Sequence, residues 1–586
     1  MKKQPKLLIG VIAAITVLAV VIISIVMTAA GGSRDTYDSH MELAQRYLDE
    51  LKHDQAIAEY EAAIAIDPKK EDAYLGLADV YVAMGDMEKA LEVLSEGYEQ
   101  TQSERIARRM EELAQAERDL SESNSTVEEQ ALENQEGETA GNISDAEAPQ
   151  MEQMVTFIPW SEAGLEDHVM DWQDENLEAA MREFTGITDR DIMLSDVWEL
   201  TSLNLYLDLG LYPNQICNIS ALSDMTNLTE LCLYGNQISD ISALSGLTNL
   251  TKLDWRYNSI SDISSLRGLT NLTWLELGGN QISEISALSS LTSLTVLLLN
   301  GNQISDISAL SGLTNLTELH LFNNQISDIS ALSGLTNLTK LDWSYNSISD
   351  ISSLRGLTNL TELDLRGNQI SDISALSGLI NLTVLDLGHT KISDISALSG
   401  LTNLTVLDLG FNQISGISAL SGLTNLTELN LWTNRIIDIS ALSGLTNLTK
   451  LDLRGNQISD ISALSDLTNL TALYLNVNQI SDISALGGLT NLMELGLGGN
   501  QIGDISTLSG LTYLTYLHLV ANQISDISAL GSLTSLTDLS LQRNQICDIS
   551  ALSGLTNLTY LSLEDNPIDD YSPVEFIEQN GGTLYK

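Results

Sequence analysis

The sequence has few basic residues and few cysteines. It contains 27 Lys and Arg against 79 Asp and Glu, which gives a formal net charge of −52. A chain this acidic repels other polyanions, so we exclude nucleic acid as a partner. The three cysteines, at positions 217, 232 and 547, have no regular spacing. They therefore do not form the framework of a disulfide-rich fold.

Motifs for catalysis are also absent from the sequence. It has no nucleophile elbow, no HExxH pair and no phosphate-binding loop. His320, His389 and His518 are expected to point from strands, but they fall in repeats three and six apart, hence about 14 Å and 29 Å at the strand spacing. A shared ion needs ligands at about 2 Å. We therefore expect no enzyme activity, no metal and no cofactor.

A unit of 22 residues recurs from about residue 206 to residue 566. Its most regular member is an Asn, replaced once by Thr390, at 214, 236, 258, 280, 302, 324, 346, 368, 412, 434, 456, 478, 500, 522, 544 and 566. The core pattern LxxLxLxxN at this period is the leucine-rich repeat signature. One such coil cannot bury its own apolar side and must stack on its neighbours, so the sequence predicts a solenoid.

Each unit combines a short strand, an Asn and a turn. Leu363 and Leu365 alternate with polar residues, which predicts a strand with one buried face. Asn368 is expected to bond backbone groups of its own and the adjacent coil, forming a ladder in which Thr390 is the weak position. The segment 371–376 predicts a short 3₁₀ turn on the convex side. Trp255 and Trp343 replace inward leucines and are expected in the core.

An Asp four residues after most of these Asn residues forms a second column, as at Asp372. Two interpretations are open. The Asp side chains either bind calcium or cap the following turn by accepting backbone N–H groups. The spacing favours the cap, since calcium loops need clustered acidic residues and glycines within one turn.

The motif LTNLTELDLRGNQISDISALSG, residues 357–378, resembles the 22-residue repeats of the bacterial internalins. The preceding segment resembles the internalin N-terminal cap, with a helical stripe of Leu177, Ala180, Met181 and Phe184. Residues 567–586 resemble a closing cap. The repeats carry alanine, as at Ala375, where internalins often carry proline. The resemblance implies a parallel sheet on the concave face and makes that face the receptor side.

Residues 7–30 are uncharged and long enough to span a bilayer as a helix. Lysines precede them and Arg34 follows, which predicts a cytoplasmic N-terminus. A cleaved signal peptide is the alternative, but the apolar stretch is long for one. In either case the rest of the chain is expected outside the cytoplasm. We therefore expect a single-pass cell-membrane protein with extracellular repeats.

Apolar positions 34 residues apart, such as Tyr47 and Tyr81, indicate tetratricopeptide-like helical repeats over residues 35–120. Such a module is either a binding groove or a stalk. Residues 121–153 have many acids and no Lys or Arg, which predicts a disordered linker. The expected order is a cytoplasmic tail (1–6), a transmembrane helix (7–30), the tetratricopeptide-like module (35–120), the linker (121–153), the N-terminal cap (154–206), the leucine-rich repeats (207–566) and the C-terminal cap (567–586).

The aromatic residues concentrate at the outward positions of the repeat strands and their exits. Exposed aromatics dominate protein interfaces, although sugars stack on them too and strand propensity also favours them. Charged residues between them add polar specificity. The predicted partner-binding residues on the concave face are Tyr212, Tyr234, Tyr257, Trp274, Glu318, His320, Phe322, Lys340, Tyr345, Arg366, Phe411, Trp432, Tyr474, Tyr516 and Tyr560.

These observations predict non-catalytic recognition of a protein at a cell surface or in the envelope. Two alternatives use other features of the chain. The same aromatics would suit carbohydrate or cell-wall binding, and the tetratricopeptide-like module would suit an envelope scaffold.

Overall fold

The computed structural model describes residues 53–66, 68–83, 87–101, 157–205 and 215–586, together with residues 37, 41, 44, 103, 105, 106, 109 and 110. The chain divides into two compact units, residues 1–149 and 150–586. The finer domain limits given above stay predictions.

The first unit contains three described helices, α3 (His53–Ile66), α4 (Glu71–Ala83) and α5 (Met87–Thr101). Two glycines allow these helices to approach closely. A Cβ on Gly76 would lie 2.4 Å from the Tyr60 ring, and one on Gly97 would lie 2.6 Å from the Tyr74 ring. Both tyrosines are fully buried, so the rings fill the space that the missing side chains leave.

The fold-class prediction included a transmembrane helix over residues 7–30, and this part is corrected. Those residues lie outside the described ones, and no described helix is long and apolar enough to cross a membrane. The longest, α5, has 15 residues, whereas a bilayer requires about 20. For the described residues, the fold class is therefore a repeat solenoid plus a helical module.

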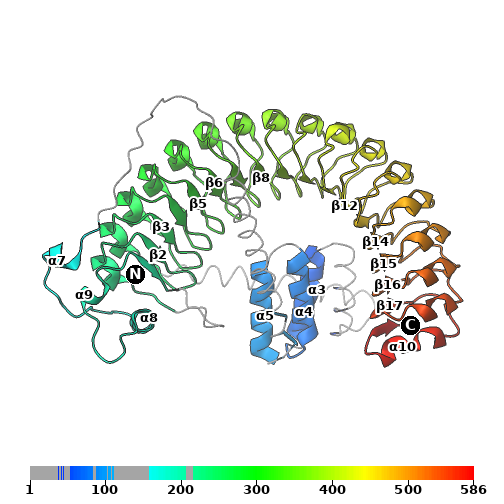
Figure 1. Ribbon diagram of the computed structural model, residues 1–586, viewed down its shortest axis with the longest axis horizontal. Coiled ribbons are helices and arrows are strands. Elements are labelled where there is room, and N and C mark those ends of the chain that lie inside the picture. The colour runs from blue at the N-terminus through cyan, green and yellow to red at the C-terminus, as the bar shows by residue number, and fades with distance from the viewer. Residues whose placement is uncertain are drawn as a thin grey trace, which may run out of the picture. The chain divides into compact units, whose positions relative to one another are not determined.

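The second unit is built on an 18-stranded parallel sheet in which each strand pairs with the next in sequence. Figure 1 shows the strands on the inner side of the repeat arc and the 3₁₀ helices on the outer side. The strands are β1 (Ser202–Asn204), β2 (Glu230–Cys232), β3 (Lys252–Asp254), β4 (Trp274–Glu276), β5 (Val296–Leu298), β6 (Glu318–His320), β7 (Lys340–Asp342), β8 (Glu362–Asp364), β9 (Val384–Asp386), β10 (Val406–Asp408), β11 (Glu428–Asn430), β12 (Lys450–Asp452), β13 (Ala472–Tyr474), β14 (Glu494–Gly496), β15 (Tyr516–His518), β16 (Asp538–Ser540), β17 (Tyr560–Ser562) and β18 (Thr583–Tyr585).

A short 3₁₀ helix follows the strand in each coil. The predicted turn at 371–376 is confirmed as 3₁₀, but it begins three residues later, at Ser374. These helices are η1 (Ser220–Asp224), η2 (Ser242–Gly246), η3 (Ser264–Gly268), η4 (Ser286–Ser290), η5 (Ser308–Gly312), η6 (Ser330–Gly334), η7 (Ser352–Gly356), η8 (Ser374–Gly378), η9 (Ser396–Leu398), η10 (Ser418–Gly422), η11 (Ser440–Leu442), η12 (Ser462–Leu464), η13 (Ser484–Gly488), η14 (Ser506–Gly510), η15 (Ser528–Ser532), η16 (Ser550–Gly554) and η17 (Ser572–Val574).

The Asp column caps these turns, which confirms the second interpretation. Asp372 Oδ1 accepts the backbone N–H of Ser374 at 2.8 Å, and this hydrogen bond lowers the pKa of Asp372. A local side-chain bond thereby fixes the two residues before each 3₁₀ helix except η10, where Gly416 replaces the Asp.

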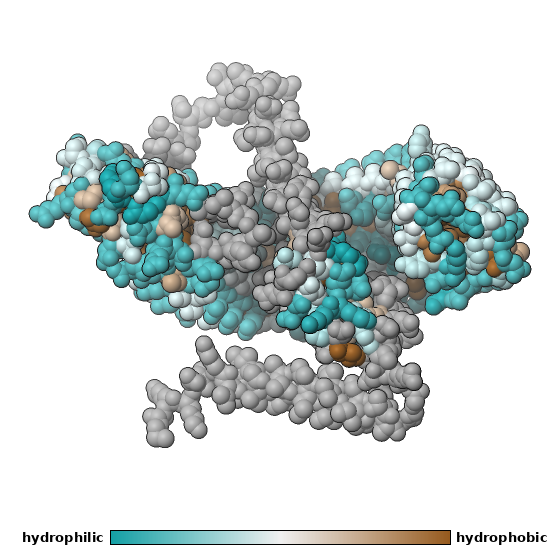
Figure 2. Space-filling view, turned by 90° about the horizontal axis from the view of Figure 1, so that it is seen from below, coloured by the Kyte–Doolittle hydropathy of each residue, from teal (hydrophilic) through white to brown (hydrophobic). Residues whose placement is uncertain are grey.

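Leucine and isoleucine columns fill the space between the sheet and the turns. Leu360, Leu363, Ile370 and Ile373 are all at most 2% exposed, and Trp255 and Trp343 are fully buried as predicted. In the space-filling view, the visible outer faces of both ends of the repeat unit are mostly hydrophilic, with hydrophobic residues in small separate patches (Figure 2).

A polar cap covers the first coil. It contains α7 (Trp160–Ala163), α8 (Glu175–Thr185) and α9 (Leu194–Val197). Asp174 caps α8 through the N–H of Leu177 and also accepts the N–H of Cys217 at 2.7 Å and of Asn218 at 3.0 Å. Burial opposes ionisation of Asp174, but these backbone donors outweigh it and lower its pKa. One carboxylate therefore joins the cap to the repeats.

The predicted apolar stripe of α8 is only partly buried. Leu177, Ala180 and Met181 are at most 3% exposed, whereas Phe184 is 41% exposed, so the last turn does not contribute to the core. At the other end, η17 leads into α10 (Glu575–Gln579) and then β18, which extends the sheet by one parallel strand.

The Asn ladder links each described coil that carries the Asn to the coil before it. The Nδ2 of Asn368 donates to the carbonyls of Leu365 at 3.0 Å and, in the preceding coil, of Trp343 at 2.8 Å, while its Oδ1 accepts the N–H of Ile348 at 2.9 Å. Thr390 is the exception. Its hydroxyl contacts Leu387 O and Asn412 Oδ1, and in this described stretch no hydrogen bond joins it to the preceding coil.

We expect Thr390→Asn to stabilise the solenoid. The new amide would restore the bonds to the preceding coil, and each such bond contributes about 1 kcal/mol. Urea unfolding should show a higher midpoint for Thr390→Asn and a lower one for Asn368→Thr, which creates a second weak position. A Thr390→Asn midpoint at or below that of the wild type would contradict this account of the ladder.

Candidate functional site: the concave face of the repeats

The concave face is formed by four positions in each repeat, and the predicted binding residues occupy all four. Tyr212 lies outside the described residues. Trp274, Glu318, Lys340, Tyr516 and Tyr560 begin strands, and His320 and Tyr474 end them. Tyr234, Phe322, Arg366 and Trp432 follow two residues after a strand, and Tyr257, Tyr345 and Phe411 follow three residues after one.

Position three after the strand is a left-handed turn. Tyr257, Tyr345 and Phe411 have φ of 53°, 51° and 54°, a conformation that costs a non-glycine residue roughly 1–3 kcal/mol. Their rings are 38–46% exposed. His389 occupies the same position with φ 52°, so the prediction that it points from a strand is wrong.

Aromatic rings contact one another at several places along the face, including Tyr516 with His518 and Tyr560 with Tyr585. Near the N-terminal end of the sheet, Tyr234 and Tyr257 meet edge to face at 5.3 Å between ring centroids. In the middle, the rings of His389, Phe411 and Trp432 all contact one another, with centroid distances of 4.7 Å for His389 and Phe411, 5.4 Å for His389 and Trp432, and 5.7 Å for Phe411 and Trp432. We call His389, Phe411 and Trp432 the central aromatic cluster. Sequence reasoning included two of its members and assigned His389 to the wrong position.

A row of carboxylates lies beside the central aromatic cluster. Asp342, Asp364, Asp386 and Asp408 end four consecutive strands and are register partners. Arg366 bridges two of them, with Nη2 2.5 Å from Asp364 and Nε 3.2 Å from Asp386. The set of predicted binding residues includes Arg366 but none of the four acids, although their common register position could have identified them.

Burial and mutual repulsion oppose ionisation in this row. Burial, and then the charges of Asp364 and Asp408, raise the pKa of Asp386 to about 7. Burial also raises the pKa of Asp342 and of Asp408. Strands are about 4.8 Å apart, so carboxylates at the same position of neighbouring strands are held close together and repel one another when both are ionised.

The predicted charged residues are paired with one another or with neighbours. His320 lies 3.0 Å from Glu318, and Lys340 lies 3.5 Å from Glu362 on the next strand. A side-chain hydrogen bond from His320 lowers the pKa of Glu318. Within the described ranges no three His, Cys, Asp or Glu side chains come together as a metal site.

The comparisons with known proteins agree with this geometry. A family model described as "Leucine Rich repeats (2 copies)" matches in overlapping segments from residue 226 to residue 575, and a tetratricopeptide repeat model matches residues 47–113. The chain belongs to the leucine-rich repeat family. More specifically, it is an internalin-like member with an N-terminal tetratricopeptide-like module.

Three solved structures illustrate the similarity. An internalin (inlF) from Listeria monocytogenes is 29% identical, with 71% of this chain and 95% of that chain covered and a TM-score of 0.38. The functional domain of InlJ from Listeria monocytogenes is 25% identical, with 64% and 82% covered and a TM-score of 0.56. A TDR receptor is 25% identical, with 64% and 69% covered and a TM-score of 0.56. No curated protein sequence matches the chain.

The raised pKa of Asp386 predicts a pH dependence of stability. Unfolded Asp has a pKa near 3.8, so between this value and about 7 the folded protein binds a proton that the unfolded chain does not. The stability that this proton provides is therefore present below about pH 4, is lost progressively as pH rises from about 4 to about 7, and does not change further above that range. We expect Asp386→Asn to raise the urea midpoint at pH 8 and to change it little at pH 4.

The converse variant serves as the control. Asn430→Asp extends the row by one carboxylate and should steepen the loss of stability between pH 5 and pH 8. If Asp386→Asn and the wild type lose stability equally over this range, Asp386 does not carry the raised pKa.

Proposed function

We propose that this chain is a non-catalytic recognition protein whose leucine-rich repeats bind a protein partner through the concave face. The observation that carries the proposal is the set of partly exposed aromatic rings along that face, since aromatic side chains provide most of the binding energy in protein interfaces. Membership of the leucine-rich repeat family and similarity to a protein named as a receptor support it.

The left-handed turns support the same proposal. Gly367 and Gly455 adopt this conformation at the corresponding position of other repeats and avoid the backbone cost that a side chain brings. Tyr257, Tyr345 and Phe411 accept the cost and present exposed rings instead. Other non-glycine residues, including Val477 and Ala521, share this conformation at the same position of their repeats, so the support comes from the exposed rings that the turn presents.

We further propose that the repeats act outside the cell. Support comes from the sequence alone. Lys6 precedes the apolar residues 7–30 and Arg34 follows them, and basic residues before such a stretch favour a cytoplasmic N-terminus with the rest of the chain outside. A tag at Lys586 should be accessible to antibody and to protease on intact cells. Protection of the tag until the cells are lysed would contradict this location.

The concave-face assignment is tested on the full chain. Trp274, Phe322, Tyr345 and Trp432 are replaced together by Ala, and captured partners are compared after crosslinking. We expect them to be lost, because removing central aromatic residues typically costs 2 kcal/mol or more each. Tyr513→Ala is the control, since this ring is 65% exposed but lies outside the sheet.

Two other outcomes identify the alternatives. Partners that survive the four substitutions but disappear when residues 47–113 are deleted would assign the function to the helical module. Binding to cell-wall material that resists protease treatment of the target would identify a carbohydrate ligand.

A further inference from the structure

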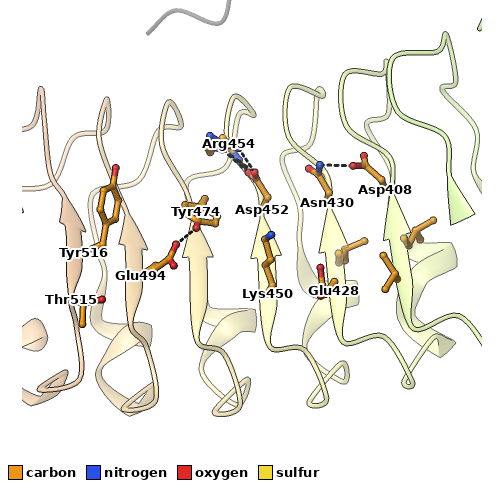
Figure 3. A pocket seen from close by; sticks show the side chains of 13 residues that line it. Asp408, Glu428, Asn430, Lys450, Asp452, Arg454, Tyr474, Glu494, Thr515 and Tyr516 are labelled. Atoms are coloured by element: carbon orange, nitrogen blue, oxygen red, sulfur yellow. Dashed lines mark hydrogen bonds and ion pairs between the residues drawn. The ribbon is translucent and has the colours of Figure 1, made fainter. Parts of the chain in front are cut away.

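A hollow of about 590 Å³ lies on the concave face of strands β10 to β15. Figure 3 shows the side chains that line it, which come from successive strands. They include the carboxylates Asp408, Glu428, Asp452 and Glu494, the cations Lys450 and Arg454, and the rings of Tyr474 and Tyr516. We call this region the β10–β15 hollow.

Internal bonds hold the walls of the hollow in place. Arg454 Nη2 lies 2.6 Å from Asp452, and its guanidinium lies 5.3 Å from the centroid of the Tyr474 ring. The Tyr474 hydroxyl donates to Glu494. The Asn430 amide donates to Asp408 at 2.7 Å. Lining groups fixed in this way lose little freedom when a ligand binds.

The charges of the hollow do not cancel. Arg454 neutralises Asp452, which leaves the carboxylates Asp408, Glu428 and Glu494 against the single cation Lys450. Glu428 and Lys450 are register partners on β11 and β12, yet in the described chain neither forms an ion pair. Asp408 is partly buried and receives hydrogen bonds only from neutral donors, Gly410 N and Asn430 Nδ2. The hollow is therefore electronegative and also exposes the aromatic rings of Tyr474 and Tyr516.

We propose that the β10–β15 hollow binds a Lys or Arg side chain on a segment of the protein partner. This inference rests on the proposed function and names the chemistry that the concave face selects. A cationic group complements the excess carboxylates, and the tyrosine rings provide favourable faces for its stem and its charge.

Lys450 opposes such a ligand, and its environment differs from that of the equivalent lysines. Lys252 lies 4.8 Å from the centroid of the Trp274 ring, and Lys340 pairs with Glu362. For Lys450 the register partner on the next strand is Ala472, which offers neither a ring nor a charge. Lys450 thus stands as an exposed positive charge that a basic ligand must approach. Removing it should strengthen binding of a basic ligand.

The test uses the full chain and two blocked peptides of equal length, acetyl-SRSRSRS-amide and acetyl-SESESES-amide. Calorimetry or fluorescence anisotropy at 0.15 M salt measures their affinity for three variants. Asp408→Asn/Glu428→Gln removes two carboxylates of the hollow, Lys450→Met removes its opposing cation, and Glu230→Gln/Glu564→Gln removes two carboxylates elsewhere on the face. Circular dichroism verifies folding.

We expect the arginine peptide to bind the wild type and to bind Asp408→Asn/Glu428→Gln about tenfold more weakly, as for loss of a partly desolvated charge contact. Lys450→Met should raise the affinity for the arginine peptide by about twofold or more relative to the wild type. Glu230→Gln/Glu564→Gln should change this affinity by less than about twofold. Opposite effects of two substitutions in one hollow cannot arise from a loss of folding.

Three results would overturn the inference. The first is that the arginine peptide fails to bind the wild type. The second is that both double variants lower the affinity for this peptide equally, which would indicate attraction to the net charge of the chain alone. Preferential binding of the glutamate peptide, lost in Lys450→Met, would assign the hollow to an anionic group. In each case the capture experiment with the four aromatic substitutions decides separately whether the concave face binds a partner.

Discussion

The structure depends on the Asn side chain that joins each coil to the one before it. Asn368 uses its two N–H groups and its carbonyl oxygen on backbone groups of two coils, so it satisfies polar groups that the stacking buries. Because this bond pattern repeats every 22 residues, the strands have one fixed register. Every side chain on the concave face consequently stands beside its counterpart in the next repeat, with no freedom to slide away from it.

The fixed register creates the concave surface, and it also causes repulsion between like charges on adjacent strands. Duplicating a repeat with an Asp at the end of its strand places like charges on adjacent strands, as with Asp364, Asp386 and Asp408. Burial, and then the repulsion from Asp364 and Asp408, raise the pKa of Asp386. Arg366 relieves one side of this row, and Asn430 ends it by replacing a carboxylate with an amide that donates to Asp408. Repulsion of this kind stabilises a complex with a cationic partner relative to the free protein.

The sequence allowed the solenoid to be predicted because a single period governs burial and hydrogen bonding. Leucine columns, the Asn ladder, the buried Trp255 and Trp343 and the 3₁₀ turns all follow from position within the repeat. For the concave face, the sequence predicts which repeat positions point outward, but not the backbone conformation or the side-chain pairs at those positions. His389 was assigned to a strand because the left-handed turn depends on backbone geometry that Gly, Tyr, Phe and His all adopt there. Ion pairs such as Arg366 with Asp386 depend on side-chain rotamers, which no periodicity specifies.

The binding surface is a property of pairs of repeats and not of single ones. The Tyr257 ring lies over Gly279 and the Tyr345 ring over Gly367, where a Cβ would come within 2.6 Å of the ring. Each exposed tyrosine therefore needs a glycine one repeat later. The second pair lies 88 residues, or four repeats, after the first, and the stretches 247–273 and 335–361 that contain the two tyrosines are nearly identical. Duplication of a block larger than one repeat keeps tyrosine and glycine together, whereas exchange of single repeats would separate them and displace the ring.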